Sequence, residues 1–372
     1  MTTDVGLYLH IPFCKQRCNY CDFCSSVLSD HGDVDAYIEK LILEAEEYKG
    51  RNIGVDTVYI GGGTPSLLSP SAFERLLIGL CDVFSFDRVS EFSMEANPGT
   101  LTKEKLSAYK SFGVNRISIG LQSVNENELV KLGRIHGYGD FLEAYRLARQ
   151  VGFENVSVDL MYGIPEQTAE SFKHSLNSVI ALGVEHISVY GLILEPGTRF
   201  YSERHKLKLP DEDEELKMYE LCCRELSLKD YGHYEISNYS KSGLECRHNL
   251  KYWRNEEYIG LGMSAYSYFD GKRYGNSREV KEYFSSERAK YRQVDIVDLQ
   301  TESFEYAMMR LRLKEGISLR EYERKFSRSF LDGNRDILKK YCDMGLVLLS
   351  EDRLSLTERG FYLSNYIMSD IL

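Results

Sequence analysis

The stretch HIPFCKQRCNYCDFCSS, residues 10–26, places four cysteines close together, at positions 14, 18, 21 and 24. The first three have the spacing C-x3-C-x2-C, and the fourth follows after two further residues. Cysteine thiolates hold iron–sulfur clusters and zinc. A structural zinc site usually takes four ligands as two separated pairs, whereas a loop with this spacing can hold three corners of a [4Fe–4S] cube and leave one iron open. The stretch therefore favours an iron–sulfur site, with zinc as the alternative.

The composition of the 372 residues is that of an ordinary globular protein, with 43% hydrophobic and 28% charged residues. This length fits one α/β domain with a smaller module. The net charge of -11 argues against a general binder of nucleic acid or anionic membranes. We find no apolar run of membrane-spanning length and no signal peptide, so we expect a cytoplasmic protein. In that compartment the nine cysteines do not indicate a disulfide framework.

Short β-rich runs alternate with stretches of helical periodicity through the first part of the chain. The expected strands are 7–11, 57–63, 91–97, 116–123, 155–163 and 186–194. Clear helical patterns between them cover 34–48, 71–84 and 138–152. Repeated strand–helix units of about thirty residues predict a parallel sheet, either doubly wound or barrel-like.

The pattern changes after about residue 230. Residues 231–300 are rich in Tyr, Gly and Asn and have few clean periodicities, so we expect an irregular connecting segment. Residues 301–372 contain helical runs followed by a hairpin, VLLSEDRLSLTERG, which is typical of a winged-helix-like module. This module has equal numbers of basic and acidic residues, so we interpret it as a structural cap or partner surface and not as a DNA-binding element.

The cysteine spacing resembles the signature of the radical S-adenosylmethionine (SAM) superfamily, in which the loop follows the first barrel strand. The resemblance implies a partial (β/α)6 TIM-like barrel over residues 1–230. It also implies that Cys14, Cys18 and Cys21 hold a [4Fe–4S] cluster whose open iron is chelated by SAM. Polar or glycine-rich residues follow the expected strands, at the rim where parallel barrels build their sites. The residues to which the resemblance gives a role with SAM are Tyr8, Tyr20, Gly62, Gly63, Thr64, Glu95, Gln122, Arg134 and Asp159.

Those roles follow the chemistry of the side chains. The glycine turn lets backbone approach the methionine end of SAM. Glu95, Gln122 and Asp159 suit the ammonium or the ribose hydroxyls, and Arg134 suits the carboxylate. Tyr8 and Tyr20 are expected to flank the cluster and shield it.

The motifs LYLHIPFC, GGGTPS, MEANPGT, ISIGLQS and VDLMYGIP, with the C-terminal module, resemble one branch of the superfamily. It comprises oxygen-independent coproporphyrinogen III dehydrogenases and the HemW-type heme chaperones. The dehydrogenases carry a further cysteine two residues after the third ligand, where this chain has Phe23. They also have a long segment before the cluster, whereas only thirteen residues precede Cys14 here. Both differences favour the chaperones.

Residues 246–253, CRHNLKYW, contain the H-N-x-x-Y-W motif of the heme-binding relatives. The resemblance implies that His248 is an axial heme ligand. It implies that Tyr252 and Trp253 offer flat faces to the macrocycle, and that Asn249 orients the histidine or a propionate. From spacing alone, a histidine beside aromatic residues is more simply a core histidine, and Cys246 and His233 are alternative ligands.

We therefore predict a protein that binds heme and transfers it to an acceptor protein, with a [4Fe–4S] cluster and SAM in its core. A membrane-associated respiratory enzyme is one candidate acceptor of the heme. The chain could form a homodimer, and nucleic acid is not expected as a partner. The alternative function is radical-SAM decarboxylation of coproporphyrinogen III. A radical-SAM methyltransferase is disfavoured, because the chain has no extra methyl-carrying cysteine motif and its C-terminal module is neutral.

Overall fold

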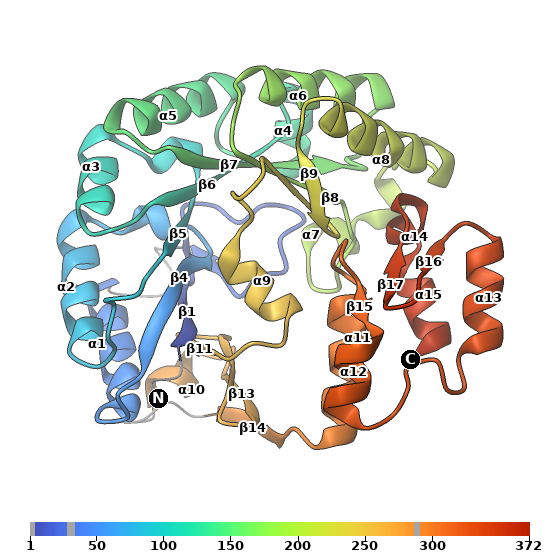
Figure 1. Cartoon of the computed structure of the whole chain (residues 1–372). Coiled ribbons are helices and arrows are strands. Elements are labelled where there is room, and N and C mark those ends of the chain that lie inside the picture. Colours follow the sequence, from blue (N-terminus) through green and yellow to red (C-terminus); the bar gives the residue numbers. More distant parts are fainter. Residues whose placement is uncertain (1–3, 28–33, 286–290) are drawn as a thin grey trace.

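The computed structural model describes residues 4–27, 34–285 and 291–372, and its centre is a twelve-stranded sheet. Six parallel strands lie next to one another in chain order: β1 (Asp4–Ile11), β4 (Gly54–Gly62), β5 (Glu91–Ala96), β6 (Arg116–Gln122), β7 (Asn155–Tyr162) and β8 (His186–Gly191). Figure 1 shows these strands curving around a central space, with helices on the outside. The six strands expected from the sequence and the partial-barrel class are confirmed.

The outer layer consists of the helices that connect these strands. They are α1 (Val34–Ala45), α2 (Pro70–Cys81), α3 (Lys103–Ser111), α4 (Glu126–Leu132), α5 (Tyr138–Val151), α6 (Ala169–Ala181), α7 (Arg199–Ser202) and α8 (Glu212–Ser227). Hydroxyl side chains cap the amino ends of several of them. Ser69 accepts a hydrogen bond from the Ala72 amide at α2, and Thr168 accepts one from the Ser171 amide at α6. The sequence thus sets where these helices begin.

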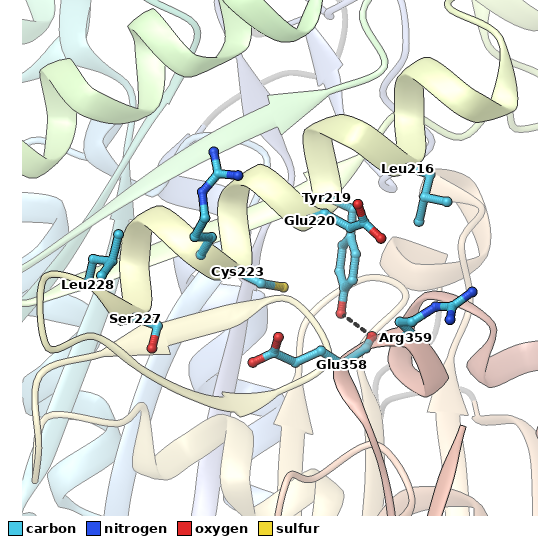
Figure 2. A pocket seen from close by; sticks show the side chains of 9 residues that line it. Leu216, Tyr219, Glu220, Cys223, Ser227, Leu228, Glu358 and Arg359 are labelled. Atoms are coloured by element: carbon cyan, nitrogen blue, oxygen red, sulfur yellow. Dashed lines mark hydrogen bonds between the residues drawn. The ribbon is translucent and has the colours of Figure 1, made fainter. Parts of the chain in front are cut away.

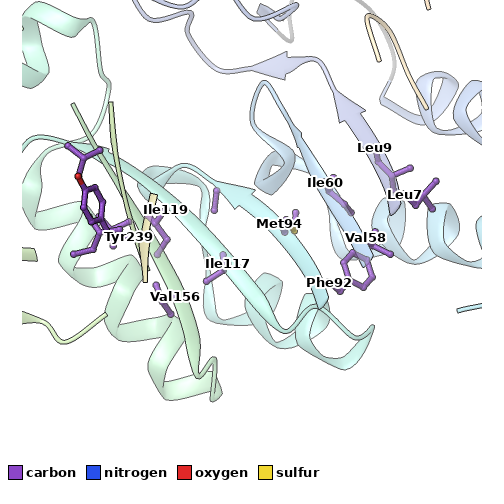
Figure 3. Packing of buried hydrophobic residues seen from close by; sticks show 14 of the residues in the cluster. Leu7, Leu9, Val58, Ile60, Phe92, Met94, Ile117, Ile119, Val156 and Tyr239 are labelled. Carbon is purple, nitrogen blue, oxygen red and sulfur yellow. The ribbon is translucent and has the colours of Figure 1, made fainter. Parts of the chain in front are cut away.

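Successive residues of each strand point to opposite faces of the sheet, which separates an apolar layer from a polar interior. The apolar set faces the helices and forms the main core (Figure 3); it includes Leu7, Leu9, Val58, Ile60, Phe92, Met94, Ile117, Ile119 and Val156. The alternate positions carry polar side chains toward the barrel interior, among them Tyr59, Glu95, Arg116 and Asp159. A TIM barrel usually fills this space with branched apolar residues. Here the interior is available for a site.

Residues 231–300 are not irregular as expected, because they extend the sheet at both edges. Strands β9 (Gly232–Glu235) and β10 (Asn238–Ser240) lie beside β8, and β11 (Tyr258–Leu261), β12 (Tyr266–Phe269), β13 (Lys272–Asn276) and β14 (Tyr291–Ile296) extend from β1. Helix α9 (Arg247–Trp253) crosses the barrel interior, and α10 (Val280–Ser285) precedes β14. Most of these strands have only three to five residues, too few to show a period of two. The domain boundaries expected at residues 230 and 300 stay a prediction.

The C-terminal residues form a small module of helices around a three-stranded antiparallel sheet, as expected. Its elements are α11 (Leu299–Arg310), β15 (Ile317–Ser318), α12 (Leu319–Phe326), α13 (Arg335–Asp343), β16 (Val347–Leu349), β17 (Arg353–Leu356), α14 (Glu358–Tyr362) and α15 (Ser364–Ile371). The order helix–strand–helix–helix–strand–strand over α11–β17 is that of a winged helix.

The module joins the barrel through α8 and through the chain around β9. Figure 2 shows α8 and α14 facing each other across a cavity of about 430 Å³, where the Tyr219 hydroxyl donates to the Glu358 carbonyl at 3.0 Å. The amides of Ile236 and Lys314 donate to the carbonyls of Arg312 and Tyr234. Among the described helices, none is both long and apolar enough to cross a membrane.

Candidate cofactor site

A cavity of about 490 Å³ opens at the carboxyl ends of the parallel strands and reaches down into the barrel. It is lined by residues from nearly every barrel strand, from the cysteine loop and from α9. Of the residues that the sequence pointed to, the cavity brings together Cys14, Cys18, Tyr20, Cys21, Gly62, Gly63, Thr64, Glu95, Gln122, Arg134, Asp159 and Asn249. Residues more than 200 positions apart thus meet at the predicted rim.

The cysteine loop is held at both ends by short-range structure. Strands β2 (Phe13–Cys14) and β3 (Ser26–Val27) pair in parallel and close the loop. Inside it, the His10 Nε2–H donates to the Cys24 carbonyl at 2.7 Å, and the Tyr8 hydroxyl donates to His10 Nδ1 at 3.0 Å. Because His10 is buried, this chain of bonds fixes the loop against β1.

The three thiols face the cavity beside polar donors. The Thr64 hydroxyl lies 3.6 Å from Cys14 Sγ, and Arg134 Nη1 lies 3.4 Å from Cys18 Sγ. Burial and the neighbouring thiols raise the pKa of Cys21 to about 11, and burial raises the pKa of Cys14. Metal binding deprotonates such thiols, and donors to the sulfurs tune the bound group. Three cysteines that line one cavity, two of them beside side-chain donors, fit an iron–sulfur cluster.

Cys24 and Phe23 lie differently from the other loop residues. Cys24 does not line the cavity, and its thiol donates to the Arg278 carbonyl at 3.6 Å. Phe23 sits at the rim of the cavity with 57% of its surface exposed. The fourth cysteine is therefore turned away from the three that share the cavity.

The glycine turn after β4 is shaped by the cysteine loop that packs on it. Gly62 has φ 111°, and a Cβ there would lie 2.6 Å from the His10 ring. A Cβ on Gly63 would lie 2.6 Å from the Phe13 carbonyl oxygen. The turn can approach this loop only without side chains.

Two buried carboxyls lie near this turn. Glu95 accepts hydrogen bonds from the Tyr59 hydroxyl at 2.9 Å and from the Gly62 amide at 3.1 Å, and burial raises its pKa to about 7. Asp159 accepts from the Ser118 hydroxyl at 3.1 Å, and burial raises its pKa as well. A cationic ligand would favour the charged forms of both groups. The pair therefore suits a ligand with an ammonium or sulfonium centre.

Arg134 lies between the cysteine loop and β6. Its Nη2 donates to the Gly120 carbonyl at 2.6 Å, and its Nε is buried with no hydrogen-bond partner in the described part of the chain. Gln122 adopts φ 75° and accepts from the Tyr190 hydroxyl at 2.7 Å. Tyr20 packs on a small apolar cluster that includes Met161. The unused Nε fits the ligand carboxylate that the resemblance assigned to Arg134.

Tyr8 is not at the cavity wall. Its hydroxyl is taken by His10, and its ring stacks on Tyr59 at a centroid distance of 6.3 Å. Tyr8 therefore supports the loop from behind and does not cover the thiols.

The residues predicted to bind heme do not form one open surface. His248 is fully buried, with Nδ1 3.0 Å from the Thr57 hydroxyl and Nε2 2.8 Å from the Tyr252 hydroxyl. Both ring nitrogens are thus occupied, and burial lowers the pKa of His248 to about 3. Asn249 faces the cavity, whereas Trp253 packs under the Arg312 guanidinium at 5.7 Å. An open axial site on His248, as expected from the motif, is not present in this arrangement.

Several lining residues carried no signal that singled them out in the sequence. Tyr59, Arg116 and His186 line the cavity one layer or more below the strand ends. Each is an inward position of a strand whose outward positions are apolar. Alternation along each strand could have found them, had every inward polar residue been treated as a candidate.

The fold and the three-cysteine cavity together define a radical SAM protein. The sequence profile of the Radical SAM superfamily matches residues 8–179, and that of the HemN C-terminal domain matches residues 297–363. The solved structure titled coproporphyrinogen III oxidase (HemN) from Escherichia coli superimposes with a TM-score of 0.87 over 100% of this chain and 90% of that chain, at 23% identity.

Curated relatives define the family more closely. Heme chaperone HemW of Bacillus subtilis is 38% identical over 98% of both chains. HemW of Escherichia coli is 39% identical over 84% of this chain and 83% of its own length. The chain belongs to the HemW family.

Proposed function

We propose that the chain binds heme and transfers it to an acceptor protein, and that it holds a [4Fe–4S] cluster and SAM in the barrel cavity. The observation that carries the proposal is the similarity along 98% of the chain to proteins named heme chaperone. Phe23 supports it, because the dehydrogenases of the branch carry a cysteine at that position. When bound, the cluster and SAM supply one-electron chemistry at the open iron.

The residues that would hold these groups follow from the cavity. Cys14, Cys18 and Cys21 would hold three irons. Arg134 would bind the SAM carboxylate, and Glu95 and Asp159 would bind its ammonium or ribose hydroxyls. Tyr20, Gly62, Gly63, Thr64 and Gln122 complete the wall.

The test of the function is anaerobic reconstitution followed by two separate assays. Titration with heme should give a stoichiometric Soret band, which should decay when apo acceptor protein is added. Incubation with coproporphyrinogen III, SAM and a reductant should leave the porphyrinogen unchanged. Turnover of the porphyrinogen would show that the chain is the dehydrogenase and would overturn the proposal. A membrane-associated respiratory enzyme is the acceptor to try first, and the mass of the loaded protein reports a homodimer.

The heme ligand needs its own comparison, because His248 is buried. For His248 to ligate iron, one ring nitrogen must be released: Nδ1 by a shift of α9 away from Thr57, or Nε2 by a rotation of the Tyr252 side chain on the same helix. We expect His248→Ala to abolish the Soret band and Thr57→Ala, which frees Nδ1 without removing the ligand, to retain it. If both variants lose the band equally, His248 acts only through packing, and Cys246→Ser and His233→Ala become the variants to compare.

A further inference from the structure

Arg116 is a buried cation that the cofactor assignments above do not use. It is the first residue of β6, is 2% exposed and lines the inner end of the cavity. Its Nη1 donates weakly to the Ser93 hydroxyl at 3.5 Å, and its Nε has no partner in the part of the chain that is described. No described carboxylate oxygen lies within 4.0 Å of its guanidinium nitrogens. Buried charges are normally paired, and this guanidinium has no direct ion-pair partner among the described residues.

The nearby Glu91 carboxylate is not a direct partner of Arg116, because its oxygens accept hydrogen bonds from the start of α9. Glu91 accepts hydrogen bonds from the amides of Arg247 at 2.8 Å and His248 at 3.1 Å, and from Cys246 Sγ at 3.4 Å. These donors hold the Glu91 oxygens toward the helix. Its charge still acts on Arg116 from a distance, without a direct contact.

The carboxyls of Glu95 and Asp159 line the same cavity and interact with Arg116 electrostatically, without a hydrogen bond to it. The other side chains near Arg116 are mostly satisfied. His186 bonds to Ser157 at 2.8 Å and to the Tyr234 hydroxyl at 2.8 Å. The Asn249 side chain also faces the cavity and forms no hydrogen bond with another described residue. The inner end of the cavity therefore offers a ligand a guanidinium whose one described hydrogen bond is the long one to Ser93, and an amide with no described side-chain partner.

We propose that the inner end of the cavity is a carboxylate-binding subsite built on Arg116, separate from the groups assigned to SAM. A guanidinium matches a planar carboxylate through two parallel hydrogen bonds. The Asn249 amide lines the same cavity and can donate a third bond. The carboxylate belongs either to a small free acid or to a propionate of a tetrapyrrole, and the second source rests on the proposed function.

The first experiment measures the melting temperature of the cluster-loaded protein with sodium acetate, with sodium chloride at equal ionic strength, and with acetamide. Acetate should raise the melting temperature of the wild type and of Arg116→Lys, and should not raise that of Arg116→Gln. Acetamide, which has the same shape without the charge, should have no effect. An equal acetate response in Arg116→Gln would overturn the subsite.

The stability of the variant without acetate separates this role from a structural one. Arg116→Gln removes an unpaired charge, so its melting temperature should equal or exceed that of the wild type. Removing one partner of a buried ion pair would lower it by about 10 °C. A loss of that size would show that Arg116 has a protein partner and would overturn the proposal.

A third measurement identifies the source of the carboxylate. If it is a propionate, the wild type should bind heme about tenfold more tightly than heme dimethyl ester, and Arg116→Gln should remove the difference. If heme and its ester bind equally to the wild type, the acetate response assigns the subsite to a free acid. A Soret band that persists in Arg116→Gln shows that the protein binds heme independently of the subsite, so the two proposals can fail separately.

Discussion

Cys14, Cys18 and Cys21 line one cavity. The Cys24 thiol instead donates a hydrogen bond to the Arg278 carbonyl, and the Cys24 carbonyl accepts one from His10. The loop thus uses the backbone of Cys24 and not its sulfur. This arrangement separates three ligand candidates from one structural residue within the same short stretch.

Single serine substitutions test that separation. Changing Cys14, Cys18 or Cys21 to Ser should abolish the iron–sulfur absorbance after anaerobic reconstitution, because each removes one thiolate ligand. Cys24→Ser is the matched control and should keep the full iron and sulfide content. A cluster that survives in any of the first three variants, or is lost in the control, contradicts the assignment.

The glycine turn gives a second test at this scale. Gly62→Ala adds a methyl group 2.6 Å from the His10 ring at a residue with φ 111°, so the cysteine loop must shift. We expect a loss of about 1–3 kcal/mol in stability and weaker SAM binding. Gly99→Ala, where a Cβ meets nothing within 4 Å, is the control. Equal urea midpoints and equal SAM affinities for the two variants would contradict the close-approach argument.

The sequence predicted the site residues at the strand ends better than those deeper in the barrel. Glu95, Gln122 and Asp159 were predictable, since carboxyl ends of parallel strands meet at one rim. Arg116 was harder to predict, because it begins its strand and only alternation along that strand places it on the inward face. The burial of His248 matches the core histidine that its spacing suggested, but its partners Thr57 and Glu91 were hidden, because they lie 191 and 157 residues away in the chain.

At the scale of elements, α9 and the short strands around it changed the interpretation most. The resemblance assigned residues 248–253 to heme, whereas their spacing alone suggested a core histidine, and the helix that carries them lies inside the barrel in Figure 1. The long strands were predictable from alternation and the helices from their period. Strands β9–β14 were not, because they are short and their attachment at the two edges of the parallel sheet depends on tertiary pairing and not on their sequences alone.

The attachment of α9 to β5 through Glu91 can be tested directly. Glu91→Ala removes the acceptor of two amides and one thiol, so we expect a loss of roughly 2–3 kcal/mol and faster hydrogen exchange at the α9 amides. Glu104→Ala, on the exposed side of α3, should change neither quantity. Unchanged exchange in Glu91→Ala would mean that α9 is held by its packing alone.

Across the whole molecule, buried carboxyls and histidines lie both in the sheet and in the helices and loops packed around it. Burial raises the pKa values of Glu44, Glu95 and Glu235 to about 7. Burial lowers the pKa of His136 and His233 to about 4. Between about pH 4.5 and 7 the native state retains carboxyl protons that the unfolded chain has lost, so these carboxyls reduce stability as the pH rises. Below about pH 6.5 the histidines make stability rise with pH, which is opposite to the effect of the carboxyls. The two effects partly cancel in the pH dependence of wild-type stability.

Comparing the wild type with Glu44→Gln isolates one of these contributions. Glu44 bonds to the Tyr283 hydroxyl at 2.7 Å and to the Gly262 amide at 3.0 Å, and both bonds can persist with glutamine. The wild type pays an increasing cost for the buried charge from about pH 5 to pH 8, whereas glutamine does not titrate. The unfolding free energy of Glu44→Gln minus that of the wild type should therefore rise by roughly 3 kcal/mol over this range. Urea denaturation at each pH, with thiols kept reduced, measures the difference. The loss of the bond to Asn276 gives only a constant offset, so a difference that stays flat with pH would show that Glu44 ionises without cost in the folded protein.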